Sequence, residues 1–179
     1  DIFTEEKNFA LVCFGDSNTH GYCADPNDSE THSDRFSENE RWTCLLQKAL
    51  GEEYLVLEEG LSGRTTVFTD PLHESMAGLD TAYSCLMSHE PVDLMIVMLG
   101  TNDLLEGVTA EAAAARMEAF LNRCSVPMIL LISPPPMKRS AWVPDDGLVE
   151  ESKELSRQYK ALAAQRGIQF ADAGEWDVA

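Results

Sequence analysis

The amino-acid sequence predicts a single three-layer α/β domain, and three observations support that fold class. Five short segments are apolar throughout, as in strands that are buried on both faces of a parallel sheet. Segments with helical spacing alternate with them, which is the order of elements in α/β proteins. The 179 residues contain no repeat, low-complexity tract or linker, and they suffice for one substantial core. We therefore expect residues 1–179 to form one domain with helices on both faces of the sheet.

Each expected element has a recognisable pattern in the chain. The strands are expected at residues 9–14, 54–57, 93–99, 128–132 and 168–171. The helices are expected at residues 41–50, 74–89, 110–123 and 148–166. Thr109 is the expected N-cap of the third helix, and Gly51 and Gly167 are the expected ends of the first and last. Residues 23–39 are polar, and loops of that length in compact domains are usually functional or mobile.

The composition excludes several classes of partner. Lys and Arg number 13 against 31 Asp and Glu, which gives a formal charge of −18. A chain with this negative charge is repelled by phosphate backbones and anionic lipid surfaces. We therefore expect no nucleic acid or membrane partner. No apolar run approaches the ~20 residues of a membrane helix, and residues 1–7 lack the features of a signal peptide. Five cysteines, an odd number without a C-x-x-C pair, indicate a reducing compartment such as the cytoplasm.

Three polar turns follow expected strands, at residues 15–17, 62–63 and 100–103. Each turn alone is commonly a plain turn or a helix cap. The carboxyl ends of parallel strands meet at one edge of a sheet, where ligands bind, so the fold brings the three turns together. A serine hydroxyl such as that of Ser17 generates an oxyanion when it attacks an ester carbonyl. The backbone N–H groups of Ser17 and Gly63 and the side-chain amide of Asn102 are candidate donors to that oxyanion.

The same turns resemble the first three sequence blocks of the SGNH (GDSL) hydrolases, at residues 14–17, 60–63 and 100–103. Within that superfamily, the chain is most similar to the small bacterial arylesterases that also transfer acyl groups. Further matching segments lie at residues 41–43, 58–62, 98–103, 133–136 and 172–174. The resemblance therefore extends over nearly the whole chain, in the same order.

The resemblance implies both a fold and a function. The fold is a flavodoxin-like sheet of five parallel strands in an α/β/α arrangement, the SGNH hydrolase fold. The function is hydrolysis of small neutral acyl or aryl esters through an acyl-enzyme, with acyl transfer to alcohols, and without a cofactor or metal. Family analogy is also the sole basis for expecting a homo-oligomer.

The resemblance further assigns roles to seven residues. Ser17 is the implied nucleophile, and Ser17, Gly63 and Asn102 form the implied oxyanion hole. The residues expected to form the substrate-binding pocket are Asp16, His20, Ser62 and Asp103. His20 is expected in the pocket wall, where the similar arylesterases carry a bulky aromatic residue.

The family's fourth block has no counterpart in the chain. That block is an Asp-x-x-His near the carboxyl end, which supplies the general base and the group that orients it. One explanation is that the segment follows Ala179 in the native protein and is missing here, so that residues 1–179 form the domain without it. The alternative is a naturally short chain that uses another base or is inert. An inert chain would be a non-catalytic ligand-binding domain that keeps the oxyanion pocket.

All four histidines lie in the first half of the chain, and the local context of each does not favour it as that base. Besides His20, these are His32 in the acidic loop, His73 at the rim of the cleft, and His89 at a helix end where the dipole favours it. No two histidines fall at zinc-ligand spacing. A further interpretation, with Asp16 as a phosphoryl acceptor, is weak because it lacks a second aspartate two residues on and a lysine after a later strand.

Overall fold

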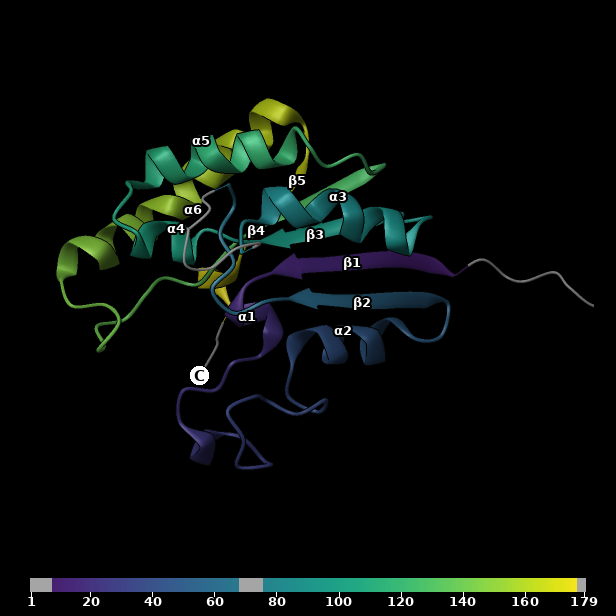
Figure 1. Ribbon diagram of the computed structural model, residues 1–179, viewed down its shortest axis with the longest axis horizontal. Helices are drawn as coiled ribbons and strands as arrows, with labels where there is room; N and C mark the ends of the chain where they lie inside the picture. Colours follow the sequence, from purple (N-terminus) through teal and green to yellow (C-terminus); the bar gives the residue numbers. More distant parts are fainter. Residues whose placement is uncertain (1–7, 68–75, 177–179) are drawn as a thin grey trace, which may run out of the picture.

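The computed structural model describes residues 8–67 and 76–176 and shows a sheet of five parallel strands (Figure 1). The strands are β1 (Phe9–Gly15), β2 (Tyr54–Gly60), β3 (Leu94–Met98), β4 (Met128–Ser133) and β5 (Gln169–Asp172). Their order is β2-β1-β3-β4-β5, and every neighbouring pair is parallel. The predicted flavodoxin-like sheet is therefore confirmed, with all five strands at the expected places.

Helices cover both faces of the sheet, which confirms the three layers. The helices α3 (Gly78–His89), α5 (Ala110–Leu121) and α6 (Asp146–Arg166) lie on one face, and α2 (Trp42–Leu50) lies on the other (Figure 1). The first face holds the larger core, in which alternate residues of β1 and β3 pack against the three helices. The second core is smaller and joins the opposite side of the same strands to α2.

The ends of the helices follow local signals in the sequence. The Thr109 side chain accepts a hydrogen bond from the Ala112 N–H, as predicted for the N-cap of α5. Gly167 adopts the left-handed conformation that ends α6. The helix α3 begins at Gly78, later than the predicted residue 74, because Ala77 forms a parallel bridge with Thr65; the predicted residues 74 and 75 lie outside the described part of the chain.

Two short helices were not predicted, and both follow strands directly. They are α1 (Ser17–His20), after β1, and α4 (Thr101–Leu105), after β3. Each is too short to show a helical period in the sequence. Both helices begin within turns that were predicted at the carboxyl edge of the sheet. Their positions therefore agree with the prediction, although their helical form does not.

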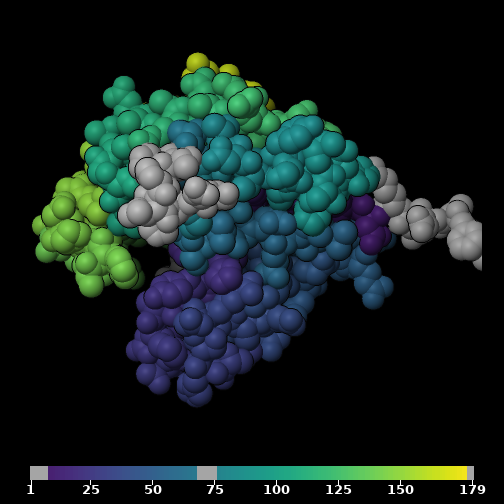
Figure 2. Space-filling model, viewed as in Figure 1, coloured from purple at the N-terminus to yellow at the C-terminus, as the bar shows by residue number. Residues whose placement is uncertain are grey.

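The long polar loop at residues 23–39 is folded back on itself. An antiparallel bridge joins Tyr22 to Arg35, and a 3-10 turn (Pro26–Asp28) lies between them. Figure 2 shows this purple-to-blue region and the yellow-green segment between β4 and α6 as two separate bulges. In the described ranges, no helix has the length and apolar character needed to cross a bilayer.

Candidate active site

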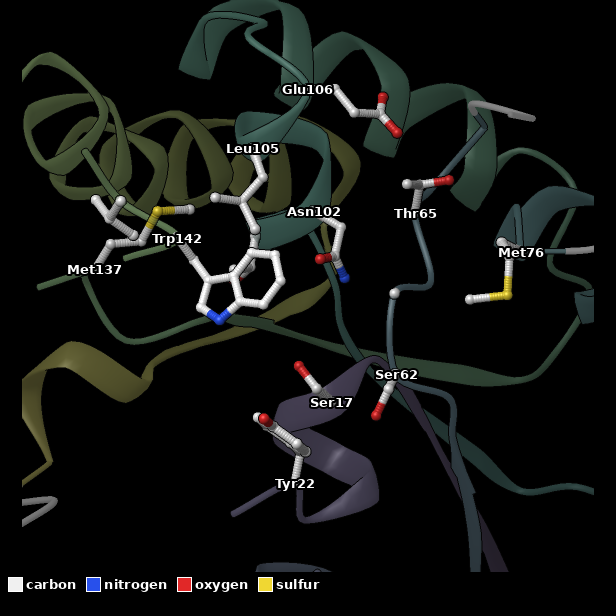
Figure 3. Close-up of a pocket in the computed structure, with 13 residues that line it drawn as sticks. Ser17, Tyr22, Ser62, Thr65, Met76, Asn102, Leu105, Glu106, Met137 and Trp142 are labelled. Atoms are coloured by element: carbon white, nitrogen blue, oxygen red, sulfur yellow. The ribbon is translucent and has the colours of Figure 1, made fainter. Parts of the chain in front are cut away.

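A cavity of about 600 Å³ lies at the carboxyl edge of the sheet, where the three predicted turns meet. Its lining includes Ser17, Ser62, Gly63 and Asn102. Figure 3 shows the Ser17 hydroxyl and the Asn102 amide directed into the same space. These four residues come from three segments that are far apart in sequence, and the parallel sheet brings them together.

Ser17 is held by a tight helical turn directly after β1. Asp16 is the N-cap of α1, and its carboxylate accepts a hydrogen bond from the Asn18 N–H at 3.0 Å. The turn packs against Gly60, at the end of β2, where an added Cβ would lie 2.2 Å from the backbone nitrogen of His20. A glycine is therefore required there, because any side chain would push α1 and its serine away from the sheet.

Arg64 fixes the loop that carries Ser62 and Gly63. Its Nη1 donates to the carbonyl oxygens of Gly15 at 3.2 Å and Glu59 at 2.6 Å, which ties the loop to the ends of β1 and β2. Its guanidinium also lies over the Phe14 ring, 4.1 Å from the centroid. Gly63 has φ +85°, a left-handed conformation that a residue with a side chain rarely adopts.

Asn102 is oriented by the same loop. Its Nδ2 donates one hydrogen to the Arg64 carbonyl oxygen at 3.0 Å. A side-chain amide carries two N–H donors, so one hydrogen is available to the cavity. The next residue, Asp103, is turned inward, and its carboxylate accepts hydrogen bonds from the Thr66 hydroxyl at 2.7 Å and the Thr66 N–H at 3.2 Å.

Two buried carboxyl groups lie beneath the cavity and have raised pKa values. Burial raises the pKa of Asp16 to about 7, and the negative charge of Asp103 contributes in the same direction. Burial also raises the pKa of Asp103, against the hydrogen bonds from Thr66 and the charge of Arg116. The Asp16 Oδ2 atom has no hydrogen-bond partner among the described residues. The protein interior directly behind Ser17 thus holds a carboxyl group that is poorly solvated when ionised.

The structure does not place Asp16, His20 or Asp103 in the lining of the cavity. Asp16 and Asp103 are fully buried. His20 is half-buried, and its carbonyl oxygen accepts a hydrogen bond from Arg35 Nε at 2.8 Å. Direct contact between these three side chains and a substrate stays a prediction.

The other histidines also lie outside the cavity lining. His32 is exposed in the acidic loop, as predicted. His89 ends α3 and its Nε2 lies 2.9 Å from Glu59 Oε1. His73 is outside the described residues. Within the described part of the chain, no histidine lines the cavity.

Sequence reasoning missed an apolar and aromatic part of the lining. Tyr22, Leu105, Met137 and Trp142 contribute to it, and the Trp142 side chain lies across the cavity in Figure 3. Trp142 is 79% exposed, an unusual position for a large apolar residue. The available signal was a tryptophan in the polar, proline-rich segment between β4 and α6.

The sheet order is that of the doubly wound α/β proteins, and the cavity that contains Ser17 lies at the edge of the sheet where such proteins bind ligands. Residues 13–179 match the GDSL-like Lipase/Acylhydrolase family, and the chain belongs to that family. The predicted resemblance is confirmed, and membership makes the chain a carboxylic ester hydrolase. A comparison with the curated proteins gave no significant match.

Solved structures agree with this assignment. The M. smegmatis aryl esterase is 34% identical with a TM-score of 0.83, over 93% of this chain and 84% of that one. A carbohydrate acetylesterase from Sinorhizobium meliloti is also 34% identical, with a TM-score of 0.83, over 94% of this chain and 85% of that one. AlinE4, an esterase of the SGNH-hydrolase family, shares the fold at 24% identity and a TM-score of 0.64, over 92% of this chain and 76% of that one.

Proposed function

We propose that Ser17 is the nucleophile of this ester hydrolase. Its hydroxyl oxygen attacks the ester carbonyl, the alcohol leaves, and water or a second alcohol releases the acyl group from the serine. The observation that carries the proposal is the convergence of Ser17, Gly63 and Asn102 on one cavity. With water as the second reactant the outcome is hydrolysis, and with an alcohol it is acyl transfer.

The proposed oxyanion hole consists of the Ser17 N–H, the Gly63 N–H and the Asn102 amide. The first N–H groups of a helix have no acceptor within it, and Ser17 is the first residue of α1. Asn102 is held by the Arg64 carbonyl, so its free amide hydrogen is oriented before the substrate arrives. Such preorganised donors stabilise the tetrahedral oxyanion by about 3–4 kcal/mol each.

Asp16 and Asp103 support these groups from beneath in our proposal. Asp16 caps the helical turn that presents Ser17, and Asp103 holds Thr66 next to the loop of Gly63. Both side chains are buried, so they act by positioning. Ser62, in the cavity lining, and the half-buried His20 are the predicted pocket residues that remain available for direct substrate contact.

We propose that the general base is the histidine of the family's carboxyl-terminal Asp-x-x-His motif, in a segment that follows Ala179 in the native protein, and is not His73. The support is twofold. No histidine within residues 8–67 and 76–176 lines the cavity. The chain also covers 84% of the M. smegmatis aryl esterase, so part of that enzyme has no counterpart in the alignment. Such a histidine would accept the Ser17 proton and return it to the leaving alcohol.

The proposed substrates are small, neutral aryl or acetyl esters. The lining includes Tyr22, Leu105, Met137 and Trp142, which suit an apolar or ring-shaped group, and the formal charge of −18 disfavours anions. The relatives named for aryl esters and carbohydrate acetyl esters point the same way.

The five free cysteines support a reducing compartment, the cytoplasm. A homo-oligomer remains a proposal by family analogy.

Replacement of the nucleophile is the most direct test. We expect Ser17→Ala in the complete native protein to lower kcat for p-nitrophenyl acetate by at least about 1,000-fold, because no acyl-enzyme can form. A serine-directed fluorophosphonate should label the wild type and not the variant. The matched control is Ser84→Ala, which removes an exposed hydroxyl of α3 outside the cavity lining and should keep both labelling and kcat. Hydrolysis that survives in Ser17→Ala would refute the assignment.

Removal of the amide donor tests the oxyanion hole separately. We expect Asn102→Ala to lower kcat by about 100- to 1,000-fold with a much smaller change in KM, because the donor acts mainly on the transition state. Fluorophosphonate labelling should slow but remain on Ser17. A change confined to KM would show that Asn102 binds the substrate without stabilising the oxyanion.

A further inference from the structure

Three metal-ligating side chains converge outside the cavity. Glu59 is the next-to-last residue of β2, and Cys85 and His89 lie on α3. Their ligand atoms, a carboxylate oxygen, a sulfur and an imidazole nitrogen, all lie within 4.8 Å of one another. From this convergence we propose that Glu59, Cys85 and His89 form a binding site for a divalent transition-metal ion such as Zn²⁺.

The fold positions each of the three ligands. Cys85 and His89 are four residues apart on one helix, so they share a face and lie one turn from each other. Leu57 of β2 packs into the core beneath α3, and Glu59, two residues later, points to the same side of the sheet. A search for paired histidines in the sequence misses this set, because it contains one histidine and takes its carboxylate from a distant strand.

The spacing of the ligand atoms suits a small ion after minor adjustment. His89 Nε2 lies 2.9 Å from Glu59 Oε1. Zinc bonds of about 2.0–2.3 Å place neighbouring ligand atoms of a tetrahedral site about 3.3–3.8 Å apart. Side-chain rotations that move these atoms by about 1 Å therefore admit the ion. All three residues are half-buried, so water can supply the fourth ligand.

Metal binding at this site displaces the proton of the thiol. Burial, and then the charge of Glu59, raise the pKa of Cys85 to about 12, so the thiol is protonated at neutral pH. The S–H bond breaks, the sulfur–metal bond forms, and the proton passes to solvent. The bound ion then faces the thiolate and the Glu59 carboxylate, whose two negative charges outweigh the nearby positive charge of Arg64.

None of the three ligands lines the cavity, so the ion has no direct access to Ser17. It would join the last turn of α3 to the end of β2, two elements that hydrogen bonds from His89 and Cys85 to Glu59 already connect at this point. The ion therefore stabilises the fold and takes no part in ester hydrolysis. This role is independent of the proposed catalytic mechanism.

Cobalt titration tests the site with a spectroscopic readout. Protein stripped of metal with a chelator is titrated with Co²⁺, and we expect one ion per chain. The spectrum should show a sulfur-to-cobalt charge-transfer band in the near ultraviolet and intense tetrahedral bands in the visible. Cys85→Ser should lose the charge-transfer band, and His89→Gln should weaken binding at least about tenfold. Excess Zn²⁺ should bleach the cobalt spectrum and raise the Tm of the wild type.

The matched control is Cys124→Ser, since Cys124 is also half-buried and its pKa is also raised by burial to about 12. This variant should keep the complete cobalt spectrum. Glu59→Gln provides a second test if Cys85→Ser does not fold, and it too should weaken cobalt binding. The proposal is overturned if the wild type gives no charge-transfer band, or if that band persists in Cys85→Ser or disappears in Cys124→Ser.

Discussion

Asp16 and Glu58 are carboxyl groups at the ends of neighbouring strands, and the protein treats them in opposite ways. Asp16 follows β1 beneath the cavity, fully buried, and burial raises its pKa to about 7. Glu58 lies in β2 on the α2 side. Hydrogen bonds from Arg41 and then from Thr43 lower its pKa to about 2, against partial burial. The pKa values of the two groups differ by about five units, although β1 and β2 are hydrogen-bonded to each other.

The difference lies in the partners that each carboxylate has. Glu58 receives two hydrogen bonds from the Arg41 guanidinium, at 2.9 and 3.2 Å, and one from the Thr43 hydroxyl at 2.6 Å. Asp16 accepts the Asn18 N–H on one oxygen, and its other oxygen has no partner among the described residues. The ionised Glu58 carboxylate therefore stabilises the fold, whereas ionisation of the buried Asp16 carboxyl destabilises it.

The substitution Asp16→Asn should have the largest effect. A raised pKa means that the unfolded state releases its proton first as pH rises from 3.8 towards about 7. The free energy of unfolding therefore falls across this range, by about 4 kcal/mol at most. The asparagine amide does not ionise, so this loss of stability does not occur in the variant. Its buried N–H₂ group lacks an acceptor, however, and we therefore expect the free energy of unfolding to rise by about 1–3 kcal/mol at pH 8.

Urea unfolding of wild type and Asp16→Asn at several pH values measures this effect. The gain should disappear at about pH 3, below the ordinary pKa of 3.8, where Asp16 is largely protonated in both folded and unfolded states. If the difference in unfolding free energy between the two proteins is the same at about pH 3 and pH 8, the pKa of Asp16 is not raised in the folded protein.

The burial of Asp16 illustrates what could not be predicted from the sequence. The strands were predictable because a run of apolar residues is a local signal, and the meeting of Ser17, Gly63 and Asn102 followed from the parallel sheet alone. A Gly-Asp-Ser turn, by contrast, looks the same in sequence whether its aspartate faces water or the protein interior. Its solvation depends on helices and loops that pack from elsewhere in the chain.

The apolar wall of the cavity escaped prediction for a related reason. Trp142 and Met137 belong to the irregular segment between β4 and α6, which has no hydrophobic period to indicate which side chains turn inward. The path of such a segment is set by tertiary contacts. The Glu59, Cys85 and His89 cluster likewise joins residues from two elements, and the sequence indicates the helical pair without its partner on the strand.

The substitution Glu58→Gln should lower the free energy of unfolding, whereas Asp16→Asn should raise it. A lowered pKa contributes stability that is present above pH 4.5 and is lost as pH falls towards about 2. The Glu58 side chain is 31% exposed, which screens the interaction, so we expect a loss of about 1–2 kcal/mol at pH 7. Urea unfolding at pH 7 and pH 3 checks this, and the loss should be smaller at pH 3. An equal loss at both values would show that the carboxylate charge is not the cause.

The smallest effect, Arg41→Lys, separates charge from geometry on the same flank. The Arg41 side chain is 10% exposed and also donates from Nη1 to the Phe36 carbonyl oxygen at 3.0 Å. Lysine keeps the positive charge but cannot make the paired contact with Glu58, so we expect a loss of about 0.5–1 kcal/mol at pH 7. Urea unfolding should show a smaller acid dependence than in the wild type. If Arg41→Lys unfolds as the wild type does at every pH, charge alone holds Glu58 ionised, and the contrast with Asp16 then reflects a nearby cation and not the number of hydrogen bonds.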